Sequence, residues 1–585
     1  MNFLRNLLAA ILGTLIALGM LFFMFLIFVS LANVDEGVVV KNNSIMELQT
    51  KYSISDYTGN KAADPFAGLF DKAQGLDEIL HAIEVAKEDD RIRGISINSN
   101  FILAGISQTQ AIRKALEDFK SSGKFIYAYG DVFLQKDYYL ASVADSVYLN
   151  PVGSMDFKGL AAEVLFYKDL QEKTGVKMEV IRHGKYKSAV EPYLENEMSD
   201  ANRTQIRELL ASLWGSVLTD IAANRNIEVS DLNIIADTLG GRNPAYAKKS
   251  GLIDEILYMD EYESVLKNAV GIGEEEDLKY IGLSDYVKEA NKKSLRSGKD
   301  KIAVIYAQGE ILYGEGGPDY IGQGLINKAL VKAREDKNVK AIVLRVNSPG
   351  GSALTSDIIW REVELAKKEK PVVVSMGDVA ASGGYYIAVG ADKIFAEPTT
   401  ITGSIGVFGT IPNISELAAN IGINAEQVGT NKNSVDYSLF EPMTNEFRGI
   451  ITESIETTYK TFLSRVASGR NISMAQADSL AQGRVWSGTD AQRLGLVDEI
   501  GGLDDAIAEA ADLAGISEYG VRKYPKYKSN FEMLMEDLSG TESKAEAFFL
   551  KSGLGEEVYG VLKELKSAIK QRGIQARMPF TLTIK

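Results

Sequence analysis

The most apolar part of the chain is an uninterrupted run of 26 uncharged residues, Leu7 to Ala32. A helix of this length can span the hydrocarbon core of a bilayer with some tilt. Arg5 precedes the run and Asp35 follows it, so the positive-inside rule predicts a cytoplasmic N-terminus with the rest of the chain across the membrane. The alternative is a cleaved signal peptide, because the run ends in a small-x-small pattern from Ser30. The length of the run favours a retained membrane anchor.

The rest of the chain alternates amphipathic helices with short apolar strands. Leu76 to Ala86 has helical spacing, whereas Gly94 to Ile97 and Phe125 to Tyr129 have the pattern of buried strands. The same alternation returns beyond residue 300, which predicts parallel strands joined by right-handed helical crossovers. We therefore expect an α/β protein with two tandem domains. The predicted divisions are an anchor over 1–33, a stalk over 34–65, a first domain over 66–270, a linker over 271–300, a second domain over 301–515 and a C-terminal extension over 516–585.

The two domains are predicted to be copies of one another. With Gly130 placed on Gly377, nine of 22 consecutive positions are identical. Average composition predicts roughly one or two identities over such a stretch. The similarity recurs farther along the chain, where Gly251 to Ile256 matches Gly495 to Ile500. This pattern indicates a duplicated domain rather than a solenoid of many short repeats.

A candidate nucleophile distinguishes the second copy. Ser382 follows a predicted strand, Pro371 to Met376, and precedes a predicted helix, so its hydroxyl would lie where free backbone N–H groups can bind an oxyanion. The simpler interpretation is a serine that only caps the helix. Gln135 occupies the matching position of the first copy, and Phe101-Ile102 stands where the second copy has Gly350-Gly351. The joint loss of the serine and the glycines from one copy favours the catalytic interpretation.

Composition restricts the base that could activate this serine. The chain has no cysteine and two histidines, His81 and His183, neither of them in the second half, and its net charge of −15 argues against a nucleic-acid partner. A lysine is therefore the expected base, provided that burial lowers its pKa. Lys187 of the first copy aligns with Asn433 of the second, which suggests one site shared by both copies. The simpler interpretation of Lys187 is a solvated surface charge, as most lysines are. Lys185 and His183 remain alternative bases.

Four short segments form a distinctive combination in this sequence. They are VNSPGG at 346–351, ASGG at 381–384, TGSIG at 402–406 and YKSAVEP at 186–192. Together they resemble the bacterial signal peptide peptidase A (protease IV) family, in its long, duplicated form. The resemblance covers about residues 60–510 together with the apolar N-terminal run. It implies two tandem Clp protease/crotonase-like domains, of which the first is degenerate.

The resemblance also implies a Ser–Lys catalytic dyad. Ser382 matches the family nucleophile, and Lys187 matches the general base, which the first domain supplies. Gly383 and Gly351 match the residues whose N–H groups form the oxyanion hole, and Ser404 matches a serine that orients the lysine. No metal and no organic cofactor is expected.

The family is membrane-anchored, faces the periplasm in Gram-negative bacteria, assembles as a tetramer and degrades cleaved signal peptides. The resemblance therefore implies a single-pass inner-membrane serine endopeptidase whose partners are peptides, membrane lipid and other copies of the chain. Two alternatives stay open: a crotonase-like enzyme acting on acyl-CoA thioesters, and a non-catalytic membrane scaffold. The apolar N-terminal run and the lack of an obvious basic CoA-binding cluster argue against the first. The intact pair of Ser382 and Lys187 argues against the second.

Overall fold

The computed structural model describes residues 2–32, 39–50, 52–59, 73–98, 101–431, 434, 437–528 and 575–577. The apolar N-terminal run is helical, forming α1 (Asn2–Ala32). Among the helices of the described part of the chain, none combines the length and the hydropathy that a membrane crossing needs. The membrane span expected over Leu7 to Ala32 stays a prediction from the sequence. Most of the C-terminal extension, including its strand-like end at Phe580, lies outside the described residues.

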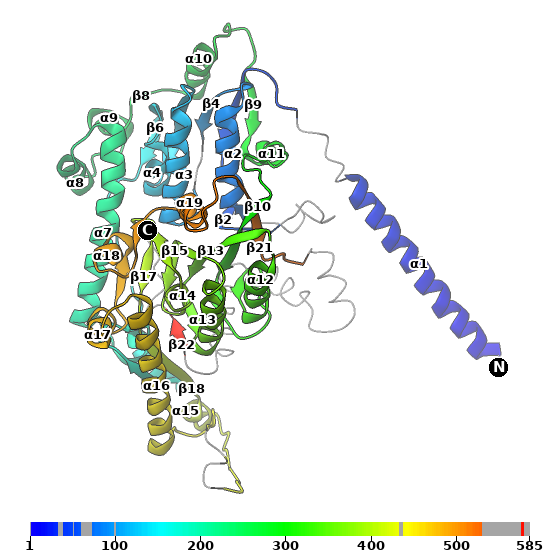
Figure 1. Ribbon diagram of the computed structural model, residues 1–585, viewed down its shortest axis with the longest axis vertical. Helices are drawn as coiled ribbons and strands as arrows, with labels where there is room; N and C mark the ends of the chain where they lie inside the picture. Colours follow the sequence, from blue (N-terminus) through cyan, green and yellow to red (C-terminus); the bar gives the residue numbers. More distant parts are fainter. Residues whose placement is uncertain are drawn as a thin grey trace.

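The first half of the chain forms a six-stranded, fully parallel sheet (Figure 1). Its strands, in spatial order, are β8 (Glu255–Ile256), β6 (Ser146–Met155), β5 (Phe125–Phe133), β4 (Ile92–Ile97), β1 (Ser44–Leu48) and β9 (Lys279–Gly282). The main helices of this half are α2 (Leu76–Glu88), α3 (Ile106–Lys120), α4 (Gln135–Ala141), α7 (Asp200–Arg225), α8 (Val229–Asp237), α9 (Pro244–Lys249), α10 (Met259–Val270) and α11 (Leu283–Ala290). Shorter elements are β2 (Ser53–Ser55), β3 (Ala73–Gly75), α5 (Lys168–Thr174), a 3₁₀ turn (Ser188–Val190) and α6 (Glu191–Leu194).

The second half forms an eight-stranded sheet that is parallel except where β17 meets β19. Its strands are β10 (Asp300–Gln308), β13 (Val339–Ser348), β15 (Val372–Ala381), β16 (Lys393–Ala396), β17 (Ile401–Gly403), β19 (Val485–Ser487), β20 (Glu499–Ile500) and β21 (Tyr519–Tyr524). Its helices are α12 (Gln323–Glu335), α13 (Ala353–Lys367), α14 (Gly383–Ala388), α15 (Ser415–Asn420), α16 (Asn445–Gly469), α17 (Met474–Leu480), α18 (Gly488–Arg493) and α19 (Leu503–Leu513).

The two sheets confirm the predicted duplication. The strand order β9-β1-β4-β5-β6-β8 in the first half corresponds to β21-β10-β13-β15-β16-β20 in the second. Equivalent buried contacts recur: the Tyr138 hydroxyl donates to the Leu252 carbonyl at 2.9 Å, and the Tyr385 hydroxyl donates to the Leu496 carbonyl at 2.8 Å. The α/β prediction is therefore correct for both halves.

The sheets extend beyond the predicted domain limits. Strand β1, in the predicted stalk, lies between β4 and β9, and Ile45, Met46 and Leu48 on it are fully buried. Strand β9 and helix α11 lie in the predicted linker, and β21 lies in the predicted C-terminal extension. These strands have four to six residues, too few for periodicity to separate them from a turn-rich connection.

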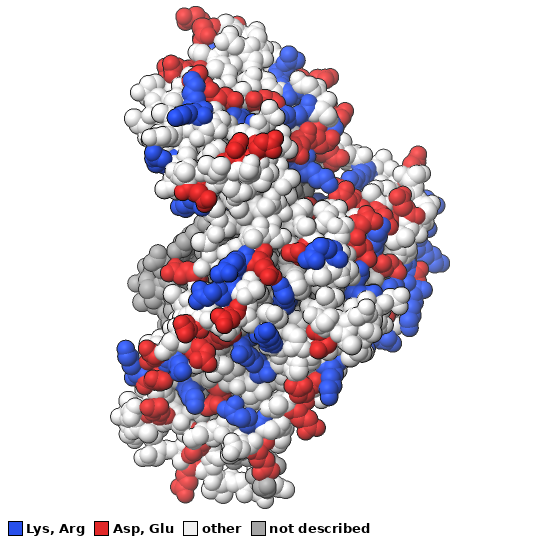
Figure 2. All heavy atoms as spheres, turned by 90° about the vertical axis from the view of Figure 1, so that its left-hand side faces the viewer, with Lys and Arg blue, Asp and Glu red and all other residues white. Residues whose placement is uncertain are grey.

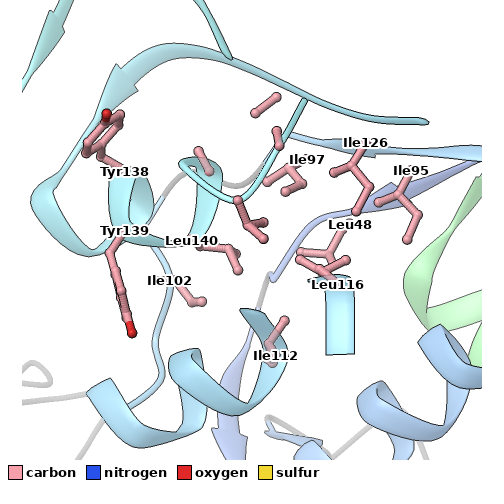
Figure 3. Close-up of a cluster of buried hydrophobic side chains, with 14 of the residues drawn as sticks. Leu48, Ile95, Ile97, Ile102, Ile112, Leu116, Ile126, Tyr138, Tyr139 and Leu140 are labelled. Atoms are coloured by element: carbon pink, nitrogen blue, oxygen red, sulfur yellow. The ribbon is translucent and has the colours of Figure 1, made fainter. Parts of the chain in front are cut away.

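The core of the first half lies between its sheet and the helices that follow the strands (Figure 3). Aliphatic side chains from the sheet (Leu48, Ile95, Ile97, Ile126) meet others from α3 and α4 (Ile112, Leu116, Leu140), and each of them is at most 1% exposed. Each such side chain contributes about 1.5–3 kcal/mol through burial.

On the face shown in Figure 2, acidic and basic side chains are interspersed, so the net negative charge is not gathered into one patch there.

A third sheet joins the two halves. Its strands, in order, are β12 (Tyr320–Ile321), β11 (Glu310–Ile311), β14 (Gly350–Ser352), β22 (Gln575–Arg577), β18 (Val407–Asn413) and β7 (Lys177–His183). Strand β7 comes from the first half and pairs antiparallel with β18 of the second over seven residues, from Val407 against His183 to Asn413 against Lys177. The main chain of the first half is thereby hydrogen-bonded into the second.

A buried polar cluster also joins the halves beside β15. Arg345 on β13 donates to Asp56 Oδ2 at 2.8 Å, and both side chains are at most 4% exposed. Gln108 on α3 donates through Nε2 to Asp56 Oδ1 at 2.8 Å and through its backbone N–H to Asp378 Oδ1 at 3.1 Å. Burial, reinforced by Asp56, raises the pKa of Asp378 to about 6. Asp56 lies in the predicted stalk, which therefore contributes to the packed interior.

We predict that Arg345→Met lowers the free energy of unfolding by about 3–5 kcal/mol, because it leaves the Asp56 carboxylate buried without its partner. Chemical denaturation measures this loss. Adding Asp56→Asn should recover part of it, since the uncompensated charge is then removed. The control is Lys340→Met, which removes an exposed ion pair with Asp300 and should cost about 0–1 kcal/mol. An equal, small loss in both single variants would contradict the prediction.

Candidate active site

Ser382 occupies a strained turn between β15 and α14. Its backbone has φ 55° and ψ −113°, a conformation that non-glycine residues rarely adopt. The turn is held by a hydrogen bond from the Ser382 N–H to the Gly403 carbonyl at 2.8 Å. The Ser382 side chain makes no capping hydrogen bond to α14, so the helix-cap interpretation is wrong. A sharp strand-to-helix turn of this kind presents a side chain for reaction.

The first half delivers Lys187 to this turn. Strand β7 ends at His183, and the chain then turns, with the Tyr186 N–H donating to the Gln482 carbonyl at 2.8 Å. Gly483 has φ +79°, and a Cβ added there would lie 2.7 Å from Lys187 Cβ. Glycine at this position therefore lets the loop of the second half lie against the lysine backbone.

Helix α7 supports the lysine loop from behind. Gln205 Nε2 donates to the Tyr186 carbonyl at 3.0 Å and to Ser188 Oγ at 3.1 Å. On the same helix, Leu209 and Leu213 pack with Ala381, the residue before Ser382, in one buried cluster. Figure 1 shows α7 extending from the first half alongside α18 of the second. One helix thus braces both sides of the site.

The Lys187 amine lies against Ser382 in a fully buried environment. Its Nζ is 2.9 Å from Ser382 Oγ, 3.0 Å from Ser404 Oγ and 3.0 Å from the Ser404 carbonyl oxygen. All three residues are 0% exposed. Burial without a compensating carboxylate lowers the pKa of Lys187 well below its ordinary value of 10.5. A neutral amine has two N–H donors and one lone pair, which matches these three oxygen atoms.

Ser404 is held in place by its own backbone. It has φ 51°, and its N–H donates to the Arg484 carbonyl at 2.6 Å. Its carbonyl and hydroxyl therefore both reach the Lys187 amine. The structure brings together Ser382, Lys187 and Ser404, the three side chains expected from the family resemblance.

One of the predicted oxyanion-hole glycines, Gly383, lies beside the glycine pair of β14, and the other, Gly351, lies against the backbone of Ile311. Gly351 has φ +151° and Gly350 has φ +95°, conformations that favour glycine. A Cβ built on Gly350 would lie 2.7 Å from the Gly383 nitrogen, so β14 passes directly beside the start of α14. The first copy has Phe101-Ile102 in place of these glycines, and this close approach would then be blocked.

The alternative bases have other partners. His183 Nδ1 is 2.6 Å from Glu456 Oε1, and its ring stacks on Tyr459 with centroids 3.8 Å apart. Lys185 is exposed, with its amine over the Tyr186 ring. Within the described ranges, no group of three or more His, Asp or Glu side chains is placed to hold a metal ion.

Two features of the site were missed in the sequence. Gly483 lies between the aligned motifs, and nothing marks it as a neighbour of Lys187 until the loop is folded. Strand β22 lies in the C-terminal extension, which could not be aligned, yet Gly351 pairs with Ala576 on it. A β-strand of three residues has too little pattern to be recognised.

The duplicated parallel fold and the comparisons with known proteins define a hydrolase of the serine peptidase class. The chain belongs to peptidase family S49, whose model matches residues 118–273 and 364–517, once in each half. It is 36% identical to Protease 4 of Haemophilus influenzae, over 84% of this chain and 82% of that protein. It is 38% identical to Protease 4 of Salmonella typhi, over 81% and 78% of the two chains. It is also 31% identical to the chloroplastic serine protease SPPA of Arabidopsis thaliana, over 92% and 78%.

These relatives confirm the predicted resemblance to signal peptide peptidase A (protease IV). They also distinguish between the functions considered from the sequence. The relatives support a serine peptidase, and they support neither an acyl-CoA enzyme nor a non-catalytic scaffold.

Burial of Lys187 predicts a pH-dependent stability. Between its lowered folded-state pKa and 10.5, the unfolded chain binds a proton that the folded chain does not. Lys187 therefore destabilises the fold most at the acid end of this window, and the cost disappears as the pH approaches 10.5. Lys187→Met should be more stable than the wild type at about pH 7, by a margin that shrinks toward about pH 9.5.

Guanidinium denaturation of both proteins at the two pH values measures this margin. Lys185→Met, a change at an exposed lysine two positions away, serves as the control and should show no such trend. A margin for Lys187→Met that does not vary with pH would show that the amine is charged in the folded protein.

Proposed function

We propose that this protein is a membrane-bound serine endopeptidase that uses Ser382 as nucleophile and Lys187 as general base. The observation that carries the proposal is the 2.9 Å separation of Lys187 Nζ and Ser382 Oγ in a fully buried site. A serine hydroxyl is a weak nucleophile at its ordinary pKa and needs an adjacent base. A lysine can serve only when it is uncharged, and burial provides that condition.

The first step is attack on the peptide carbonyl. The Lys187 lone pair accepts the Ser382 proton as Ser382 Oγ bonds to the carbonyl carbon. The Ser404 carbonyl and hydroxyl accept the two N–H groups of the neutral amine and aim its lone pair at Ser382. When Lys187 becomes an ammonium ion, the same oxygens stabilise its charge.

The next steps release the two products. The N–H groups of Gly383 and Gly351 bind the oxyanion, an interaction that contributes about 3–4 kcal/mol for a single donor in a comparable enzyme. Lys187 returns its proton to the leaving amine, and an ester on Ser382 remains. Water then attacks this ester, with Lys187 again taking and returning the proton.

The substrate class and location follow the family resemblance. We infer that the substrates are cleaved signal peptides and other apolar peptides at the membrane. The run from Leu7 to Ala32 would hold the enzyme in the inner membrane, and the charge pattern around it supports catalytic halves on the periplasmic side. A homotetramer is the assembly expected from the family.

The decisive experiment is hydrolysis of a fluorogenic apolar peptide by the detergent-solubilised full chain. Ser382→Ala and Lys187→Met should each lower kcat/KM by at least about 10³-fold, because each removes a group needed in the first step. Circular dichroism and the unfolding midpoint establish that each variant is folded.

Lys185→Ala is the matched control, since it removes a lysine of the same loop that faces solvent. It should retain the wild-type kcat/KM. Full activity in Lys187→Met would assign the base to another group. A wild-type protein that cleaves none of a broad set of peptides would remove the support for the proposed function.

A further inference from the structure

The loop of residues 481–484, between α17 and β19, lies against the backbone of both residues that surround the lysine amine. The Ser404 N–H donates to the Arg484 carbonyl at 2.6 Å. A Cβ added to Gly483 would lie 2.7 Å from the Lys187 backbone nitrogen, so the loop touches the lysine backbone directly. The position of this loop therefore sets how the lysine and Ser404 lie relative to each other.

The middle residue of this loop, Gln482, has a left-handed backbone. Its φ is 53°, a conformation that glycine adopts without steric cost and glutamine does not. Its carbonyl accepts the Tyr186 N–H at 2.8 Å, one residue before Lys187. A strained residue of this kind persists only where its surroundings hold it. The glutamine side chain is therefore expected to make contacts that a glycine could not.

The Gln482 side chain is bound by Tyr459 and Asp478. Its Nε2 donates to Asp478 Oδ1 at 2.7 Å and to the Tyr459 hydroxyl oxygen at 3.3 Å. The Tyr459 hydroxyl itself donates to Asp478 Oδ1 at 2.6 Å and accepts the Gln482 backbone N–H at 3.4 Å. Tyr459 lies on α16 and Asp478 lies on α17, and the two helices pack side by side (Figure 1). The three side chains form a closed triangle of hydrogen bonds beside the loop.

The ring of Tyr459 connects this triangle to β7, the strand that leads to Lys187. The His183 ring stacks on it with centroids 3.8 Å apart, and His183 Nδ1 is 2.6 Å from Glu456 Oε1, three residues earlier on α16. Tyr459 is 2% exposed. Burial, together with the hydrogen bond to Asp478, raises the pKa of its hydroxyl, which therefore stays a proton donor. One side chain thus contacts the loop through its hydroxyl and the lysine-bearing segment through its ring.

We propose that Tyr459 is a positioning residue for the catalytic dyad, acting with Asp478 and Gln482 to hold residues 481–484 in place. This inference rests on the proposed function of the dyad. The three side chains act through the loop backbone rather than on the Lys187 amine itself, whose three hydrogen-bonded oxygens belong to other residues.

A loosened loop should change the reaction in a recognisable way. The amine would lose its fixed place 2.9 Å from Ser382 Oγ, so kcat would fall while KM changed little. Water admitted beside the amine would favour its ammonium form and raise its pKa toward the ordinary value. The acid limb of the pH profile of kcat/KM, which marks protonation of the base, would therefore move to higher pH.

The test measures hydrolysis of the fluorogenic apolar peptide by the detergent-solubilised full chain carrying Tyr459→Phe. This change removes only the hydroxyl and keeps the ring on His183. We expect kcat to fall about 10- to 100-fold with KM within about two-fold of the wild-type value. The acid limb should lie at higher pH than in the wild type.

Tyr286→Phe is the matched control. It removes the hydroxyl of a fully buried tyrosine in the first half, which donates to Asp89 Oδ2 at 3.0 Å. Its loss should affect the unfolding midpoint but leave kcat and the acid limb unchanged.

Gln482→Gly separates positioning from stability. Glycine adopts the left-handed backbone without strain, so this variant should stay folded by circular dichroism and by its unfolding midpoint. It lacks the amide that binds Asp478, and it should therefore show the same fall in kcat and the same shift of the acid limb as Tyr459→Phe.

Three outcomes would overturn the inference while the proposed function stands, provided that the wild type cleaves the peptide and Ser382→Ala does not. The first is a wild-type kcat and pH profile in both Tyr459→Phe and Gln482→Gly. The second is a loss confined to KM, which would assign these residues to substrate binding. The third is a lower kcat that follows a lower unfolding midpoint with no movement of the acid limb. A wild-type protein that cleaves nothing would instead contradict the proposed function itself.

Discussion

The site depends on burying a lysine amine against a serine hydroxyl, with both side chains fully shielded from solvent. Burial of Lys187 disfavours its ammonium form, and the oxygens of Ser382 and Ser404 supply the polar contacts that a neutral amine still needs. Neither half of the chain could meet this requirement alone, because the lysine comes from one half and the serine from the other. The antiparallel pairing of β7 with β18, the packing of α7 and the buried contacts of Asp56 all serve to keep the two halves together at this point.

The duplication explains how such a shared site could be divided between two copies. Both halves keep the same parallel strand order, so each supplies a rigid platform with its own core. The first copy has Gln135 where the second has Ser382, and its Gln135 side chain is hydrogen-bonded to the backbone of residues 158 and 159. In the first copy, the side chain at this position holds a neighbouring loop in place. The first copy instead contributes the loop that carries Lys187, which reaches the second copy through the third sheet.

The third sheet also brings distant backbone segments together around Ser382. Strand β7 leads to Lys187, β22 pairs with both β14 and β18, and Gly350 brings the β14 backbone up to Gly383.

The sequence by itself determined the features that depend on local pattern or on the identity of a few residues. Alternating helices and strands predicted the α/β class, internal similarity predicted the duplication, and the motifs around Ser382, Lys187 and Ser404 identified the three side chains that meet. It could not place β1, β9, β21 or β22, because strands this short obtain their stability from neighbours distant in the chain rather than from their own residues. Only the tertiary structure decided that Lys187 rather than Lys185 is buried, that Asp56 belongs to the junction between the halves, and that Ala576 of β22 pairs with Gly351. Burial and pairing across hundreds of residues are properties of the folded chain, and no local segment carries them.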